Sequence, residues 1–435
     1  MTADLEQIAK DRGIKQFLVS FTDLFGVQRA KLVPAPAIGD VARSGAAFGG
    51  FATWLDMTPA DVDMFAKPDA ATLIQLPWKP EVGWVVADLC MNGEPVEQAP
   101  RNVLKRVIAA AAKSGFEMRS GVECEFFLLA PDGAQIADLT DRQAKPCYDQ
   151  QSLMRCYDVI AEVSEAMRTL GWKPYQSDHE DAHGQFEMNW AYDEALLTAD
   201  RHGFFKFMLK AVAEKHGLRA TFMPKPFANV VPNGCHAHVS LWRDGRNLFH
   251  DEDGELGLSP LAYHFLGGVL RHAPSYAALT NPTVNSYKRL NAPVLPTGAP
   301  LGPGANRISY GGNNRTHLVR IPASGRFEIR IGDGAANPYL LQAAFLAAGL
   351  DGIAKQTDPG KRLDIHMFEE GRGLTNFQLL PSNLLDAVRA LERAEVLKAQ
   401  LGAGFVSAYV KMKTMEWDAY CAALSEWERA TTLDC

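Results

Sequence analysis

Two glutamates separated by one residue occupy the stretch Gly121-Val-Glu-Cys-Glu-Phe-Phe-Leu-Leu129. The alternation of apolar and polar positions predicts a β-strand that places Glu123 and Glu125 on one face. Two adjacent carboxylates beside Phe and Leu repel each other and lose hydration. A divalent cation would offset that cost, whereas a half-exposed strand would simply leave both side chains in water. From this stretch alone both interpretations stand.

Three further strand-like segments carry polar side chains at positions i and i+2, namely Glu187/Asn189, His236/His238 and Glu328/Arg330. In a curved antiparallel sheet all these pairs can point into one funnel, which Glu180 can join across a glycine-containing turn. The pooled carboxylates and imidazole exceed the four ligands of a structural zinc site. They fit two hard ions, Mg²⁺ or Mn²⁺, that keep open positions for substrate phosphates.

A second group of candidate residues is cationic and comprises Lys288, Arg289, Arg315, Arg320, Arg326 and Arg330. Arginines beside a carboxylate–metal cluster are what phosphoryl transfer requires, because they neutralise the transferring oxygens. A surface salt bridge would explain any one of them equally well. The sequence has no GxxxxGK[ST], GxGxxG or GxSxG motif, which argues against Walker-type, dinucleotide-binding and hydrolase-elbow sites.

Charge and composition narrow the class of protein. The net charge of −7 and pI near 5.9 argue against a nucleic-acid or membrane-surface partner. No apolar run approaches the roughly 18 residues of a membrane span, and the acidic N-terminus lacks a signal core. Seven cysteines without a CxxC pair suit a reducing compartment. We therefore expect a cytoplasmic enzyme.

The elements that must position these residues follow from apolar periodicity. Residues 14–33 predict a hairpin, 48–69 a long loop, and 73–78 and 83–89 two more strands, which gives a four-stranded unit ending near Pro100. Helices are expected at 101–114, 152–170, 199–216, 337–353 and through 384–430. Further strands are expected at 121–129, 186–189, 235–242 and 325–331, with a Pro/Gly-rich loop at 287–309.

The chain resembles the glutamine synthetase family over nearly its whole length. The matching motifs, in the family's order, are Glu-x-Glu-Phe-Phe at 123–127, His-Glu-(x6)-Glu at 179–187, Phe-Met-Pro-Lys-Pro-Phe at 222–227, Gly-Cys-His-Ala-His at 234–238, Ser-Tyr-Lys-Arg-Leu at 286–290, Asn-Asn-Arg-Thr at 313–316 and Arg-Phe-Glu-Ile-Arg at 326–330. The tail from Glu416 to Cys435 is most similar to the type III branch, which is close to γ-glutamylmethylamide synthetases.

The resemblance implies an α+β fold. A small β-grasp-like N-terminal domain would span 1–100, and a catalytic domain with a curved antiparallel sheet, a half-barrel funnel flanked by helices, would span 101–435. It also implies a homo-oligomeric ring, most simply a dodecamer, in which each site is completed by the neighbouring subunit's N-terminal domain.

The resemblance further implies a ligase. ATP would phosphorylate the γ-carboxylate of L-glutamate, and an amine would displace phosphate, with two to three Mg²⁺ or Mn²⁺ ions per site. The implied first metal ligands are Glu125, Glu180 and Glu187, and the implied second set is Glu123, His236 and Glu328. The implied ATP-binding residues are His238, Ser240, Arg315, Arg320 and Arg326. Arg289, Arg330 and Gly234 would bind glutamate, and Arg315, Arg289 and Arg330 would take part in catalysis.

The sequence departs from the family pattern at three places, and the first two concern the acceptor amine. Leu295 stands where most relatives have a glutamate that closes over the acyl phosphate, and the latch-loop aspartate is replaced near 48–50. The glutamate-contacting stretch reads Val231-Pro-Asn-Gly-Cys-His236. Fewer carboxylates weaken binding of NH₄⁺ and leave a more apolar space, which suits methylamine. Tyr148, Asp61 and Asp63 are the candidate amine-pocket residues that remain.

Ammonia is the acceptor expected from the family, and methylamine is the alternative. A polyamine or cysteine acceptor would need a different pocket, and a non-catalytic ring-forming relative is disfavoured because the costly charged residues are all present. Residues 376–381 contain no tyrosine, so the adenylylation used by some relatives is not expected.

Overall fold

The computed structural model describes residues 4–292, 306–374 and 377–435. Leu295 and Asn376, the first residue of the 376–381 stretch, lie outside these ranges. Within the described residues no helix is long and apolar enough to cross a membrane.

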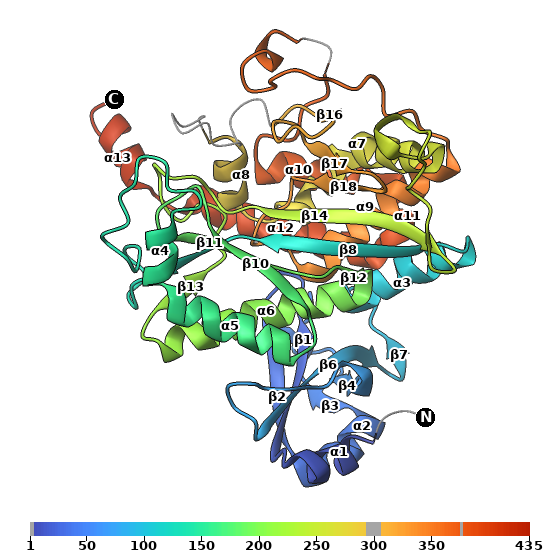
Figure 1. The fold of residues 1–435 in the computed structure, drawn as a ribbon. Helices are drawn as coiled ribbons and strands as arrows, with labels where there is room; N and C mark the ends of the chain where they lie inside the picture. The colour runs from blue at the N-terminus through green and yellow to red at the C-terminus, as the bar shows by residue number, and fades with distance from the viewer. Residues whose placement is uncertain (1–3, 293–305, 375–376) are drawn as a thin grey trace.

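The first sheet is built from residues 16–95 and lies at the blue end of the molecule (Figure 1). Its strands run in the order β2-β1-β6-β4-β3, and β1 is parallel to β6. The bounds are α1 Leu5–Arg12, β1 Gln16–Thr22, β2 Gln28–Pro34, α2 Ile38–Ser44, β3 Ala46–Phe48, β4 Met64–Pro68, β5 Ile74–Gln75, β6 Val82–Met91 and β7 Glu94–Pro95. The predicted hairpin is confirmed by the pairing of β1 with β2.

The predicted loop at 48–69 is wrong in part, because it contains β4. This strand pairs with β3 on one side and β6 on the other. Its sequence, Met64-Phe-Ala-Lys-Pro68, alternates buried and exposed positions over too few residues to be recognised as a strand beside the Asp-rich segment before it.

Two curved sheets form the larger part of the molecule. One has the order β12-β8-β14-β18-β17-β16, with β15 beside β14, and the other has the order β10-β11-β9-β13. Their strands are β8 Glu117–Cys124, β9 Phe126–Leu129, β10 Pro174–His179, β11 Gln185–Trp190, β12 Asp193–Glu194, β13 Arg219–Thr221, β14 Cys235–Arg243, β15 Arg246–Asn247, β16 Tyr310–Gly311, β17 Val319–Ala323 and β18 Arg326–Ile329. This is the α+β half-barrel flanked by helices that was predicted.

Helices cover the sheets, and α5 and α6 lie between them and the N-terminal sheet (Figure 1). The helices are α3 Pro100–Lys113, α4 Gln150–Arg155, α5 Tyr157–Thr169, α6 Ala195–Lys215, α7 Pro260–Thr280, α8 Val284–Leu290, α9 Pro338–Ala354, α10 Leu384–Glu392, α11 Glu395–Leu401, α12 Ala403–Ala422 and α13 Glu426–Thr432. The predicted helix at 152–170 is two helices, since Cys156 leaves helical geometry and caps both. The predicted loop at 287–309 begins inside α8.

Helix α7 was not predicted, although it packs along α9 at the centre of the core. Pro274, two histidines and two adjacent glycines interrupt its apolar periodicity. Those glycines allow close helix packing, because a Cβ on Gly268 would lie 2.1 Å from the Ala348 carbonyl oxygen of α9.

A buried arginine joins the N-terminal sheet to the helices. Arg101, at the start of α3, forms ion pairs with Asp69 and Asp88 near the N-terminal sheet and with Asp200 of α6. Arg101 is only 5% exposed, so this network would be costly to leave half paired. It fixes α6 against the N-terminal unit and thereby sets the position of the sheets that α6 covers.

Candidate active site

The two sheets of the larger part meet at Glu125. Strand β8 ends at Cys124, and β9 begins at Phe126 in the other sheet. The prediction of one continuous strand over 121–129 is therefore wrong. The Glu125 carboxylate accepts hydrogen bonds from the Gly234 N–H at 2.6 Å and from the Gln185 side-chain amide at 3.1 Å. Both glutamates still face the same cavity, as predicted.

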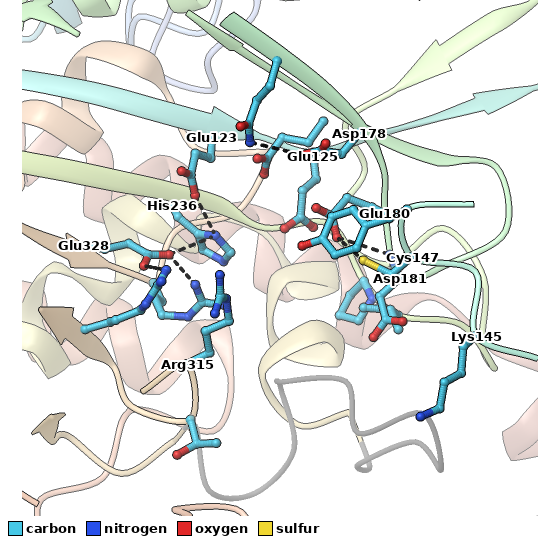
Figure 2. A pocket seen from close by; sticks show the side chains of 18 of the residues that line it. Glu123, Glu125, Lys145, Cys147, Asp178, Glu180, Asp181, His236, Arg315 and Glu328 are labelled. Atoms are coloured by element: carbon cyan, nitrogen blue, oxygen red, sulfur yellow. Dashed lines mark hydrogen bonds and ion pairs between the residues drawn. The ribbon is translucent and has the colours of Figure 1, made fainter. Parts of the chain in front are cut away.

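This main cavity has a volume of about 500 Å³ and collects side chains from several strands (Figure 2). Glu123, His236 and Glu328 lie on one side of it, and Glu180, Cys147 and Asp181 lie on the other. The predicted site residues that line it are Glu123, Glu125, Tyr148, Glu180, Glu187, His236, Arg315, Arg320, Glu328 and Arg330. The i, i+2 pattern therefore correctly predicted that residues from distant strands meet at one site.

One side, which we call the arginine wall, consists of Arg315, Arg320 and Arg330 with Glu328 between the last two. The Glu328 carboxylate is fully buried and accepts hydrogen bonds from Arg320 at 2.8 Å and from Arg330. Burial acts against ionisation, but the positive charge of Arg330, with His236 close by, lowers the pKa of Glu328 to about 2. This carboxylate is therefore ionised and compensated.

Two histidines lie beside Glu123, and His236 links it to Glu328 of the arginine wall. Register pairs His236 with Glu123, and the His236 ring lies 3.6 Å from Glu123 and 3.5 Å from Glu328. Arg326 donates to His238 Nδ1 at 2.9 Å, so Nε2 carries the hydrogen and donates to Glu123, also at 2.9 Å. Burial opposes ionisation of Glu123, but its contacts with both histidines outweigh it and hold its pKa well below the usual range.

The opposite side, which we call the acidic wall, consists of Asp178, Glu180 and Glu187. Burial and the charge of Glu125 raise the pKa of Glu180 to about 8. Burial and the charge of Glu123 raise the pKa of Glu187 well above its usual range, and burial raises that of Asp178. In the part of the chain that the structure describes, no Lys, Arg or His forms an ion pair with these three carboxylates.

This donor set fits divalent cations. Oxygens of Asp178, Glu180 and Glu187 lie within 4.8 Å of one another, and the same holds for ligand atoms of Glu123, Glu187 and His236. Carboxylate oxygens with few nitrogen donors are what Mg²⁺ and Mn²⁺ prefer. Mutually repelling, desolvated carboxylates without a cationic partner are stabilised when such an ion binds.

Gly234 fits this arrangement by lacking a side chain. A Cβ at this position would lie 2.7 Å from His236 Nε2 and 3.0 Å from a Glu125 oxygen. Any larger residue would therefore displace two candidate metal ligands.

A second cavity of about 440 Å³ adjoins the first through Glu123. The predicted residues His238, Ser240 and Arg326 line it, together with the aromatic residues Tyr175, Trp190, Tyr192 and Trp242. The rings of Tyr192 and Trp242 lie 6.4 Å apart, and the Arg119 guanidinium stacks 4.4 Å from the Trp242 ring. Flat aromatic surfaces beside polar edges suit a planar heterocycle such as a nucleobase.

Other predicted residues lie outside both cavities. Arg289 is fully buried and donates to the carbonyls of Ile331 at 2.8 Å and Arg330 at 3.4 Å. Asp61 is exposed and accepts hydrogen bonds from Thr58, which lower its pKa, and Asp63 is exposed as well. Neither aspartate lines the cavity that holds Tyr148.

Sequence reasoning missed Asp178 and the four aromatic residues. Asp178 stands two residues before Glu180 at the end of β10, so the same i, i+2 rule would have found it. Tyr192 and Trp242 come from segments fifty residues apart, and no local pattern connects them.

Comparison with known proteins defines the class. The family model described as glutamine synthetase, catalytic domain, matches residues 97–432. This chain belongs to the glutamine synthetase family, whose members use ATP and divalent metals, and it is a ligase of the glutamate–amine type.

Individual relatives carry different names. A glutamine synthetase of Rhizobium leguminosarum bv. phaseoli is 60% identical, with 100% of both chains covered. A glutamate–methylamine ligase of Methyloversatilis universalis is 40% identical, with 98% of both chains covered. A solved structure described as a GmaS/ADP complex is 63% identical, covers 100% of both chains and has a TM-score of 0.96.

Proposed function

We propose that this enzyme joins L-glutamate to methylamine at the expense of ATP and forms γ-glutamylmethylamide. The observation that supports ligase activity is the charge distribution in the main cavity. The carboxylate of the arginine wall is paired with arginines, whereas the carboxylates of the acidic wall have no cationic partner among the described residues. The observations that favour methylamine are the 40% identity to a glutamate–methylamine ligase and the sequence departures at the amine pocket.

The second cavity would hold the adenosine part of ATP. Its aromatic residues would stack on the base, and His238, Ser240 and Arg326 would face the sugar and phosphates. Because the two cavities share Glu123, the phosphates would enter the main cavity beside the arginine wall. Glu123, His236 and Glu328 would hold the divalent ion that neutralises them.

The first chemical step forms a bond between a γ-carboxylate oxygen of glutamate and the γ-phosphorus, and ADP leaves. Arg315, Arg320 and Arg330 are the chain's groups that would stabilise charge on the transferring oxygens. Glu125, Glu180 and Glu187 would hold the ion on the glutamate side. In the second step the amine nitrogen attacks the acyl carbon, and phosphate leaves.

Arg289 would act on glutamate through the backbone it holds. Its guanidinium bridges the Arg330 and Ile331 carbonyls, so it fixes the strand end from which Arg330 reaches into the cavity. In this assignment Arg330 binds the substrate carboxylate and Arg289 positions it.

The acceptor would enter on the side of the acidic wall, where Cys147 and Tyr148 also line the cavity near Glu180. A thiol and a phenol ring provide van der Waals contact for a methyl group. With leucine at 295, one carboxylate that would attract NH₄⁺ is absent from the sequence.

Ammonia is the second candidate acceptor. Two relatives named glutamine synthetase, from Rhizobium leguminosarum and Rhizobium meliloti, are 60% and 58% identical over the whole chain. The names of the relatives therefore do not decide between the two amines. The sequence departures at the amine pocket favour methylamine.

The test is ATP-dependent phosphate release with glutamate and Mg²⁺, titrating methylamine and ammonium in parallel at one pH. We expect kcat/KM to be at least tenfold higher for methylamine, which corresponds to about 1.4 kcal/mol of transition-state preference. A lower KM and higher kcat/KM for ammonium would make the enzyme a glutamine synthetase. Mass spectrometry of the product provides the independent readout.

We also infer a two-domain subunit, 1–100 and 101–435, that assembles into a homo-oligomeric ring. Phe51, Trp54 and Val62 expose 52%, 44% and 54% of their surface on the segment that carries Asp61 and Asp63. Such a surface would be covered by a neighbouring subunit, and the two aspartates would then reach the neighbour's cavity. Native mass spectrometry tests this, and we expect twelve chains on the resemblance stated above.

A further inference from the structure

A cluster of two thiols and one imidazole lies behind the active site. Cys124 of β8 and Cys235 of β14 are paired in register, and His202 comes from α6, which packs against β8. All three side chains are fully buried. Strand alternation turns the thiols away from Glu123 and His236, their neighbours in sequence, so the thiol–imidazole cluster occupies the opposite face of the same two strands.

The backbone brings the two thiols together. The Glu125 N–H donates to the Gly234 carbonyl at 3.1 Å, whereas the Cys235 N–H donates to Gly332 on the other side at 3.0 Å. Cys124 and Cys235 are therefore a non-hydrogen-bonded pair of the antiparallel ladder, in which facing side chains approach most closely.

The geometry of the cluster suits coordination. One ligand atom from each residue lies within 4.8 Å of the other two, and Cys235 Sγ lies 3.9 Å from His202 Nε2. Ligands on a tetrahedral zinc ion with ordinary Zn–S and Zn–N bond lengths are separated by about 3.5–3.8 Å. Small rotamer adjustments would close the difference. Among the described residues, His202 Nδ1 has no hydrogen-bond partner, so no contact at Nδ1 fixes the ring tautomer.

The ligand chemistry selects the kind of ion. Thiolate and imidazole prefer thiophilic ions such as Zn²⁺ and Cu⁺, whereas the carboxylates on the other face prefer Mg²⁺ or Mn²⁺. Two thiolates neutralise a divalent ion, so the complex carries no net charge into the core. Binding releases the thiol protons to solvent.

We propose that Cys124, His202 and Cys235 form a buried site for a thiophilic metal ion, separate from the metal centre of the ligase. The ion ties α6 to β8 and β14, the strands that carry Glu123 and His236. Its three ligands are closed off from solvent, so the ion would act on the stability of the fold and would not contact substrate.

The test uses cobalt(II) as the spectroscopic probe. Because the ligands are buried, the full-length protein is produced in cobalt-supplemented medium and then exchanged into excess Mg²⁺, which fills the carboxylate sites. Cobalt bound by thiolates gives an intense near-ultraviolet charge-transfer band, which cobalt bound only by oxygen and nitrogen lacks. We expect about one cobalt per chain with this band, and bleaching when Zn²⁺ or Cu⁺ displaces it. Elemental analysis of the protein from unsupplemented medium shows whether Zn²⁺ or Cu⁺ is the ion that the site binds in cells.

Matched variants locate the signal. The Cys124→Ala and Cys235→Ala variants should lose the band, whereas Cys156→Ala, which removes another buried thiol, should keep it. X-ray absorption spectroscopy of the unaltered protein should show sulfur atoms bound to the metal ion. This measurement does not depend on the folding of a variant. A wild-type protein without thiolate-bound metal under these conditions, or a band that survives loss of both cysteines, would overturn the proposal and leave the cluster as ordinary core packing.

Discussion

The two walls of the main cavity contain the same kind of carboxylate but balance its charge differently. On the arginine wall, Glu328 is held by Arg320 and Arg330, and its pKa is lowered to about 2. On the acidic wall, Glu180 and Glu187 have raised pKa values and no ion-pair partner among the described residues. The chain itself completes the first arrangement, whereas we propose that a bound cation completes the second.

Burial of a charged residue therefore has two different consequences for the folded state. A buried carboxylate with its own arginines is part of the folded framework, and removing it leaves cations unpaired. A buried carboxylate among other carboxylates destabilises the fold until a ligand arrives, which is typical of binding sites. The predictions below separate these two consequences.

The largest effect is expected from Glu328→Ala. The substitution removes a candidate metal ligand and leaves Arg320 and Arg330 without their shared partner. We expect kcat/KM for ATP-dependent phosphate release to fall by a factor of about 10³ or more. The control is Glu252→Gln at an exposed position, and near-normal activity of Glu328→Ala would refute the metal assignment.

The second largest effect is expected from Glu180→Gln on metal activation. The amide keeps the shape of the side chain but supplies a weaker ligand to the acidic wall. The Mg²⁺ concentration for half-maximal activity should rise by about tenfold or more, with recovery of much of the rate at high Mg²⁺. An unchanged Mg²⁺ dependence would mean that Glu180 holds no metal.

A pH effect on stability is expected next, in EDTA. Because the folded-state pKa of Glu180 is about 8 against an ordinary value of 4.5, the folded state binds more protons than the unfolded state between these values. The free energy of unfolding should therefore fall as pH rises from about 5 to 8, by at least about 1 kcal/mol, the equivalent of one pKa unit. Excess Mg²⁺ should remove this slope, and a slope that persists in Mg²⁺ would contradict the assignment.

The smallest effect is expected in the second cavity. Tyr192→Ala removes one aromatic surface that faces Trp242. We expect KM for ATP to rise about three- to tenfold, the range of one stacking contact, with little change in kcat. Tyr157→Ala, on a similarly exposed tyrosine of α5, is the matched control and should leave KM unchanged.

Most of the cavity could be predicted because strand alternation is a local property. Residues two apart share a face wherever the strand runs, so the pairs at 187/189, 236/238 and 328/330 pointed to one site before the fold was known. The prediction of one continuous strand through Glu125 failed, because the change from one sheet to the other depends on pairing of β9 with β11 and β13.

Features set by distant segments were not predictable. The second cavity forms only where Tyr192 lies beside Trp242. The pKa of Glu187 is raised in part because Glu123, on another strand, lies nearby. Helix α7 is buried almost all round and interrupted by proline and glycine, so neither an apolar stripe nor a clean period marks it.

The acidic wall should be unfavourable without a cation, whereas the arginine wall should not. The most direct test is equilibrium unfolding of Glu187→Gln and Glu328→Gln at equal chain concentration, each in EDTA and in excess Mg²⁺. In EDTA we expect Glu187→Gln to be more stable than the unaltered protein by about 1 kcal/mol, since the amide avoids the cost of a carboxylate whose ionisation burial and Glu123 disfavour, and Glu328→Gln to be less stable. Mg²⁺ should stabilise the unaltered protein more than Glu187→Gln. If Glu187→Gln were instead destabilised in EDTA as Glu328→Gln is, the acidic wall would be an ordinary part of the folded framework and the claim would fail.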